Sequence, residues 1–189
     1  MSIIPISTPK LALKEVEAII NKAKKSGNKN IYPDDVVFVV AIRGYRKKSM
    51  GDPTKNDRGI YDDAIFIVSP SHFSSWNANV DPGAFRKGIA NLKEGIWRYR
   101  PGPHGITFNR PGYPYPAFVQ AAPVTVVRDC VGDDTGWFGI NIHRGSNNSV
   151  SSLGCQTLPP KIWDSLESQI NFQLKTQKQK SFAYILISQ

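Results

Sequence analysis

The sequence predicts an α+β fold that is rich in β-strands, and three observations lead to this prediction. Short runs of β-branched and aromatic residues recur along the chain, Gly and Pro separate them, and two longer segments carry apolar residues at helical spacing. With 189 residues, 40% hydrophobic and 11% aromatic, the chain suits one globular domain that can bury a core. We therefore expect one β-rich α+β domain, with residues 1–35 as an N-terminal helical extension packed on it.

The first helix is expected to begin at Thr8-Pro9, an N-cap residue followed by a proline at the first helical position. Ser26-Gly27 is a plausible end of this helix. A polar, turn-rich linker over residues 28–35 follows. The apolar residues that recur at helical spacing are Leu13, Val16, Ile19, Ile20 and Ala23.

The remainder of the chain alternates between expected strands and loops. Residues 101–105 contain two prolines, which lack the N–H that a strand ladder uses, so this segment is expected to be a loop. The expected strands are residues 36–42, 64–68, 96–100, 124–127, 138–142 and 182–187. The other expected loops are residues 43–59, 69–83, 111–116 and 129–136.

A second helix is expected to start at Pro159-Pro160. Asp164 and Glu167 lie early in it and Lys175 and Lys178 late, which suits the helix dipole. Its apolar side is formed by Ile162, Trp163, Leu166, Ile170 and Leu174.

The segment most suited to chemistry runs from His143 to Cys155. An expected strand ends at His143, a Gly/Ser/Asn loop follows, and Ser152-Leu153-Gly154-Cys155 ends at a thiol, where Gly154-Cys155 is expected to open a helix. A cysteine is nucleophilic as thiolate, and a nearby base or a helix N-terminus favours that form. The alternative is a buried histidine near an inert thiol, because cysteine is among the most buried residue types.

This order, histidine before Ser-x-Gly-Cys, resembles the L,D-transpeptidase catalytic-domain family, in which a strand ends in His and a short loop leads to that motif. The resemblance covers residues 36–189 and implies an L,D-transpeptidase-like catalytic domain there, with the β-rich sandwich or barrel of that family. The chain departs from the family after the Cys: Gln156-Thr157 replaces the usual aliphatic residue and Arg that helps hold substrate. The His-to-Cys loop is also short for the family. The segments similar to a branch common in phage genomes are residues 80–83, 92–99, 123–129 and 136–143.

The resemblance implies that Cys155 attacks an amide carbonyl after His143 takes its proton. Backbone N–H groups around Gly154 and Cys155 would stabilise the oxyanion. Ser152 either shapes the loop and orients His143 or is a solvated turn serine. Arg144 either binds a substrate carboxylate or forms a structural salt bridge. The other expected substrate-binding residues are Asn141, Gln156, His104 and Trp137, the last with simple packing as its alternative.

The activity that the resemblance implies is acyl transfer on peptidoglycan stem peptides through an acyl-enzyme on Cys155. We expect a peptidoglycan hydrolase that cuts a stem-peptide or cross-link amide, a phage endolysin. The alternatives are a true L,D-transpeptidase that forms cross-links, and a non-enzymatic basic module that binds the envelope or nucleic acid. No metal or organic cofactor is expected: the three histidines do not form HExxH or a comparable zinc-binding pair.

Charge and cysteine content bear on the partner and the compartment. The net charge of +9 draws the chain to polyanions, and the expected partner is bacterial peptidoglycan rather than nucleic acid. Cys130 and Cys155 are expected to be free thiols, with a bridge between them as the alternative. The N-terminus lacks the features of a secretory signal, and no run approaches the ~20 apolar residues of a membrane span. We therefore expect a monomer in the host cytoplasm until lysis, and then in the cell wall or periplasm.

Overall fold

The structure, a computed structural model, describes residues 2–54 and 56–189. Met1 of the expected extension and Lys55 of the expected loop at 43–59 lie outside the described residues. The fold is α+β and β-rich, as predicted. The elements are α1 (Leu13–Lys25), β1 (Phe38–Arg43), β2 (Asp63–Ser69), β3 (His72–Ala78), β4 (Ala90–Leu92), β5 (Gly95–His104), β6 (Tyr115–Gln120), β7 (Val124–Arg128), β8 (Gly132–Gly136), β9 (Ile142–Arg144), β10 (Gln156–Leu158), α2 (Pro160–Thr176) and β11 (Phe182–Ser188).

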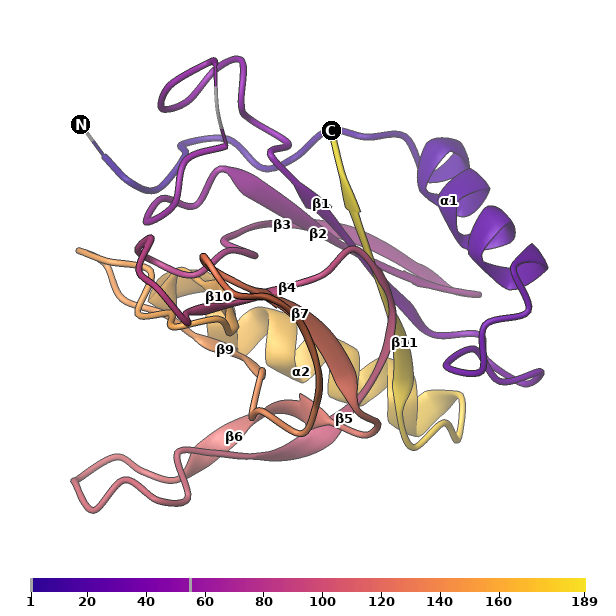
Figure 1. The fold of residues 1–189 in the computed structure, drawn as a ribbon. Helices are drawn as coiled ribbons and strands as arrows, with labels where there is room; N and C mark the ends of the chain where they lie inside the picture. The colour runs from indigo at the N-terminus through magenta and orange to yellow at the C-terminus, as the bar shows by residue number, and fades with distance from the viewer. Residues whose placement is uncertain (1, 55) are drawn as a thin grey trace.

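The main sheet has the strand order β10-β9-β6-β5-β11-β1-β2-β3 and is nearly closed (Figure 1). Its two edges approach each other where Asn79, just after β3, pairs with Thr157 of β10. Each residue donates its N–H to the other's carbonyl at 2.8 Å. The sheet is therefore barrel-like, and a smaller sheet of order β4-β7-β8 packs beside it.

Alternate side chains of the main sheet serve two separate cores, as the two-residue period of a strand requires. In and beside β1, Val37, Val39 and Ala41 join the core that includes the apolar side of α2 and residues of the small sheet. Phe38, Val40 and Ile42 join the core under α1. The two helices thus cover opposite faces of this part of the sheet (Figure 1). Neither helix of the described chain has both the length and the apolar content needed to cross a bilayer.

The first helix starts later than the sequence predicts. It begins at Leu13 and not at Thr8-Pro9, and Glu15 accepts the N–H of Ala12 at 3.0 Å. Tertiary hydrogen bonds hold the preceding segment in place of a helical turn: Ser75 donates to the carbonyl of Pro9 at 2.7 Å, and the Tyr45 hydroxyl accepts the N–H of Lys10 at 2.8 Å. The end before Ser26-Gly27 and the second helix from Pro160 are as predicted.

The expected loops at 69–83, 101–105 and 111–116 are partly wrong, because β3 lies in the first, β5 continues to His104 in the second and β6 begins at Tyr115 in the third. β5 and β6 form a long hairpin in which Pro101 faces Phe118 and Pro103 faces Pro116. Beyond Tyr99 no described strand pairs with the other side of β5. Two prolines two residues apart face the same side of a strand, so that open side tolerates their missing N–H groups. The hairpin extends away from the body of the molecule (Figure 1).

The region before the expected catalytic histidine is also arranged differently. The expected loop at 129–136 contains β8, whereas the expected strand at 138–142 is irregular until Ile142. The side-chain oxygen of Gln120 accepts the N–H groups of Phe138 and Ile140, each at 3.0 Å. One buried amide thereby takes the place of a partner strand.

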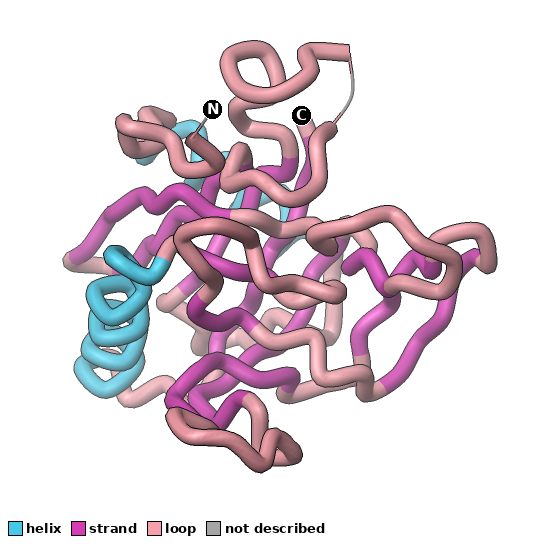
Figure 2. The backbone as a smooth tube through the Cα atoms, turned by 90° about the vertical axis from the view of Figure 1, so that its left-hand side faces the viewer, coloured by secondary structure: helices cyan, strands magenta, loops and turns pink. Residues whose placement is uncertain are grey.

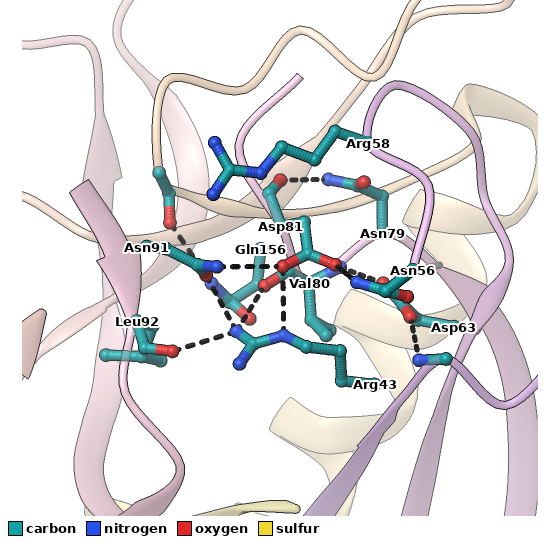
Figure 3. Close-up of polar contacts among 12 residues, drawn as sticks. Arg43, Asn56, Arg58, Asp63, Asn79, Val80, Asp81, Asn91, Leu92 and Gln156 are labelled. Carbon is teal, nitrogen blue, oxygen red and sulfur yellow. Dashed lines mark hydrogen bonds and ion pairs between the residues drawn. The ribbon is translucent and has the colours of Figure 1, made fainter. Parts of the chain in front are cut away.

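A buried polar network joins the two sheets (Figure 3). The Nε of Arg43, at the end of β1, lies 2.9 Å from a carboxylate oxygen of Asp81. Its Nη2 donates to the carbonyls of Val80 and Leu92 at 3.1 and 2.8 Å and to Asn91 at 2.8 Å. Val80 directly follows Asn79, so the network also fixes the closing pair with β10.

Two further acids, Asp62 and Asp63, lie beside this network. Asp63 accepts the N–H groups of Gly44 and Val80, both at 2.6 Å, and its burial raises its pKa well above the usual range. Asp62 is 1% exposed, and neither of its carboxylate oxygens has a hydrogen-bond partner among the described residues. Burial, with Asp81 and Asp57 nearby, raises its pKa to about 7. A buried carboxylate without a partner favours its neutral form.

We expect Asp62→Asn to stabilise the fold, and more so at high pH. The folded-state pKa of Asp62 is about 7 and the unfolded value is about 3.9. The folded state therefore binds the proton more tightly, and the wild-type protein loses stability as pH rises from about 4 to 7. The Asn variant does not ionise, so its gain in Tm should be several degrees at pH 8 and small at pH 4. Asp164→Asn, at an exposed acid, is the control; an equal Tm change at both pH values for Asp62→Asn would contradict the assignment.

Candidate active site

Cys155 and His143 line one cavity of about 320 Å³ at the molecular surface. It lies between the tip of the β5–β6 hairpin, β9 and the loop that precedes β10. Loops occupy most of this side of the molecule, which faces the viewer in Figure 2. The lining residues are His104, Phe108, Arg110, Tyr113, Tyr115, His143, Arg144, Gly145, Ser151, Leu153 and Cys155.

The parallel pairing of β9 with β10 brings His143, in β9, near Cys155, which directly precedes β10. Thr157 is paired with His143, and Gln156 donates its N–H to the carbonyl of Asn141 at 2.8 Å. The expected helix start at Cys155 is wrong, because β10 follows the cysteine and α2 begins only at Pro160. No helix N-terminus therefore stabilises a thiolate at this position.

Ser152 and Gly154 shape the turn before the thiol. The Ser152 hydroxyl accepts the N–H of Gly154 at 3.0 Å and donates to the carbonyl of Cys155 at 2.7 Å. The N–H of Gly154 is thus already used, and within the described residues that of Cys155 has no partner. Gly154 has φ +136, and a Cβ there would lie 2.6 Å from the carbonyl oxygen of Ala90. Only glycine fits both the backbone angle and the space.

The hydrogen bonds of His143 define its tautomer. Its Nδ1 lies 2.8 Å from the carbonyl oxygen of Arg144, which can only accept, so Nδ1 carries the proton. The Tyr115 hydroxyl lies 3.0 Å from the same Nδ1 and donates to the Arg144 carbonyl at 3.3 Å. His143 Nε2 is therefore unprotonated and has the lone pair that a general base needs.

His104 stacks on His143, with ring centroids 3.9 Å apart and an angle of 17° between the planes. The side-chain amide of Asn141 lies 3.0 Å from His104 Nδ1. An amide nitrogen only donates, so Nδ1 accepts and the proton of the neutral ring is on Nε2. The two stacked rings consequently have opposite roles: His143 offers a proton acceptor and His104 a proton donor.

Both reactive groups are neutral at rest. Burial lowers the pKa of His143 to about 3, with His104 and Arg144 adding to the effect and the Arg144 carbonyl opposing it. Burial raises the pKa of the half-buried Cys155 thiol to about 11, against the opposing N–H of Asn141. The thiol donates to the carbonyl of Gly139 at 3.4 Å and accepts the N–H of Asn141 at 3.4 Å. Among the described residues no hydrogen bond joins it to His143, so the site holds a thiol and an imidazole and not an ion pair.

Of the residues expected at the site, Arg144 and His104 join Cys155 and His143 in the cavity, whereas Ser152, Gly154, Gln156, Asn141 and Trp137 lie outside its lining. The Arg144 guanidinium lies 5.0 Å above the Tyr115 ring and forms no salt bridge with a described residue. Gln156 is fully buried, where it donates to the carbonyl of Gly154 and accepts from Tyr184, so it does not face a substrate. Trp137 is 64% exposed and is not a packed core residue. Asn141 is buried; its side-chain amide donates to His104 and its backbone N–H donates to Cys155, so it positions these two residues.

The sequence alone did not identify the aromatic and basic residues that the hairpin brings to the cavity. Their shared signal is the Pro/Gly-rich stretch between β5 and β6, which carries a tyrosine on each side of one proline. Cys130 and Cys155 are both free, and Cys130 is exposed. The described chain has no group of three His, Cys, Asp or Glu placed to hold a metal ion. The missed residues are Phe108, Arg110, Tyr113 and Tyr115.

Comparison with known proteins adds no assignment: no family model matches the chain, and no curated protein matches it.

We expect Cys155 to be alkylated slowly at neutral pH and faster at high pH. Because the thiolate is the reactive form, a pKa of about 11 makes the rate rise roughly tenfold per pH unit between pH 7 and 10. Iodoacetamide labelling followed by mass spectrometry, in a Cys130→Ser background, measures this rate. His143→Ala should leave the pH profile unchanged because the imidazole is neutral. A plateau below pH 8 that His143→Ala removes would show that the two groups form an ion pair.

Proposed function

We propose that the protein is a peptidoglycan hydrolase of the L,D-transpeptidase type that cleaves a stem-peptide or cross-link amide through a thioester on Cys155. The observation that carries the proposal is the convergence of Cys155, His143 and His104 in one surface cavity. The strand–His, loop, Ser-x-Gly-Cys order and the barrel-like sheet support the same family. The net charge of +9 suits an anionic cell-wall polymer.

The first step is attack by the cysteine. His143 Nε2 takes the thiol proton as Sγ turns from the carbonyl of Gly139, and Sγ bonds to the amide carbonyl carbon. The pKa values of His143 and Cys155 keep both groups neutral, so the attack starts from the thiol. Proton transfer to His143 and formation of the S–C bond then proceed together. The Arg144 carbonyl stabilises the imidazolium through Nδ1–H. The imidazolium then gives its proton to the leaving amine as the C–N bond breaks, which leaves the acyl group on Cys155.

The oxyanion needs donors that are in place before the reaction. The N–H of Cys155 has no partner among the described residues and suits this role. We assign the second donor to His104 Nε2–H, since Asn141 holds the ring in the required tautomer. His143 then activates water, which releases the acid product and restores the thiol.

Muropeptide analysis before and after incubation of peptidoglycan with purified protein tests the reaction. We expect cross-linked species to fall and monomers or shortened stems to rise. Cys155→Ala and His143→Ala should be folded but inactive, whereas Cys130→Ser, the matched change at the other thiol, should keep full activity. Accumulation of cross-linked species would instead show a transpeptidase. An active Cys155→Ala protein would overturn the catalytic assignment.

Replacement of His104 tests the proposed donor. His104→Phe keeps a flat ring against His143 but removes the N–H, so we expect kcat to fall about 10²-fold with little change in KM. The rate on a stem-peptide substrate and a thermal melt measure the two effects separately. His72→Phe, at a histidine outside the cavity, is the control and should not change kcat. If His104→Phe leaves kcat unchanged, His104 is not the donor.

A further inference from the structure

A second cavity, of about 400 Å³, adjoins the segment that leads to Cys155. Leu153 lines both this cavity and the catalytic one and is 69% exposed between them. The second cavity has a basic and an apolar part. The side chains that define it are Arg86, Lys87, Arg128, Phe138, Ile140 and Leu153.

The floor of this cavity is in direct contact with the turn before the thiol. A Cβ at Gly154 would lie 2.6 Å from the Ala90 oxygen and 2.9 Å from Ile140, and both residues line the second cavity. The thiol itself donates to the carbonyl of Gly139, which directly precedes Ile140. A substrate that crosses Cys155 can therefore occupy the catalytic cavity with one end and this cavity with the other.

The charges at the second cavity are not all available to a ligand. Arg128 donates to Asp134 at 2.7 Å and to the carbonyl of Gly88 at 3.1 Å, and its guanidinium lies 4.8 Å from the Phe138 ring centroid. The Arg128 guanidinium is therefore used in structural contacts and is not available to a ligand. The exposed side chains of Arg86 and Lys87 have no hydrogen-bond or ion-pair partner in the described part of the chain.

The loop that presents these two cations is fixed by an acid that is itself neutralised. Asp129 accepts the N–H of Arg86 at 3.2 Å, and its carbonyl accepts the N–H of Gly88 at 2.9 Å. The two carboxylate oxygens of Asp129 accept from the Arg58 guanidinium at 2.6 and 2.8 Å. Asp129 therefore positions the loop without cancelling the charge of Arg86 and Lys87.

The lining of the catalytic cavity likewise contains two arginines, Arg110 and Arg144, and no carboxylate. No carboxylate lines the second cavity either. Cations without lining acids on both sides of one nucleophile suit a ligand that is anionic at both ends. Arginine binds a carboxylate through two parallel hydrogen bonds, which also orients it.

We infer that Arg86 and Lys87 form a carboxylate subsite, and that the substrate is a peptide with a free carboxylate on each side of the scissile amide. Arg86 and Lys87 bind the carboxylate at the end of the peptide that occupies the second cavity. Arg110 and Arg144 face the carboxylate at the end that occupies the catalytic cavity. Phe138, Ile140 and Leu153 contact the adjacent apolar part of the peptide. This inference rests on the proposed function for the identity of the bond, but the subsite binds ligand whether or not the bond is cut.

Binding and turnover of paired stem peptides test the subsite. One peptide has free carboxylates, and the other has them converted to primary amides. Affinity is measured by calorimetry on the Cys155→Ala protein, which cannot turn the peptides over, with and without Arg86→Gln and Lys87→Gln. We expect the double change to lower the affinity for the free-carboxylate peptide at least tenfold and the affinity for the amidated peptide less than twofold. Lys175→Gln with Lys180→Gln, an equal loss of charge outside both cavities, is the matched control and should leave both affinities unchanged.

The outcomes separate this inference from the proposed function. Equal affinity for both peptides, or an equal loss from the control pair, overturns the subsite even if the wild-type protein cuts peptidoglycan. If the double change selectively lowers the affinity for the free-carboxylate peptide, but the wild-type protein cleaves no peptide, the subsite is supported and the proposed hydrolase function is overturned.

Discussion

The buried ion pair between Arg43 and Asp81 is the contact on which the arrangement of the two sheets depends. Arg43 binds backbone carbonyls from the segment after β3 and from β4, so one guanidinium holds the edge of the main sheet and the small sheet together. Asn79, two residues before Asp81, closes the sheet against Thr157. The turn to Cys155 lies between that closing pair and the small sheet. Loss of one partner from such a pair leaves an uncompensated buried charge and destabilises a fold strongly.

The parts of the fold that the sequence predicts correctly are those whose local pattern agrees with their environment. The strands near 36–42, 64–68 and 182–187 are continuous apolar runs because both of their faces are buried. The errors occur where a distant partner decides the conformation. β8 is polar and forms because it pairs with β7, and the prolines at 101 and 103 are tolerated because one side of β5 is open. The segment 138–141 has a strand-like sequence, but Gln120 satisfies two of its N–H groups.

The candidate site follows the same division. The motif around His143 and Cys155 is local, and the structure brings the two residues to one cavity. Both His104 and Tyr115 come from the β5–β6 hairpin; His104 was expected at the site, whereas no local pattern connects Tyr115 to the motif. The protonation states of His143 and Cys155 could not be predicted from the sequence either. Burial in the folded protein, and not the spacing of residues along the chain, sets their pKa values. A helix N-terminus beside the thiol, as expected from the sequence, would instead have favoured the thiolate.

A sulfur that stays as S–H is a slow target for peroxide and for disulfide exchange, since the anion is the species that reacts in both. The hydrogen bond to the carbonyl of Gly139 and the low pKa of His143 therefore make Cys155 a slow target for both reactions. Exposed Cys130 is the sulfur that an oxidant reaches first. The features that keep the Cys155 thiol protonated thus also lower its reactivity toward small electrophiles.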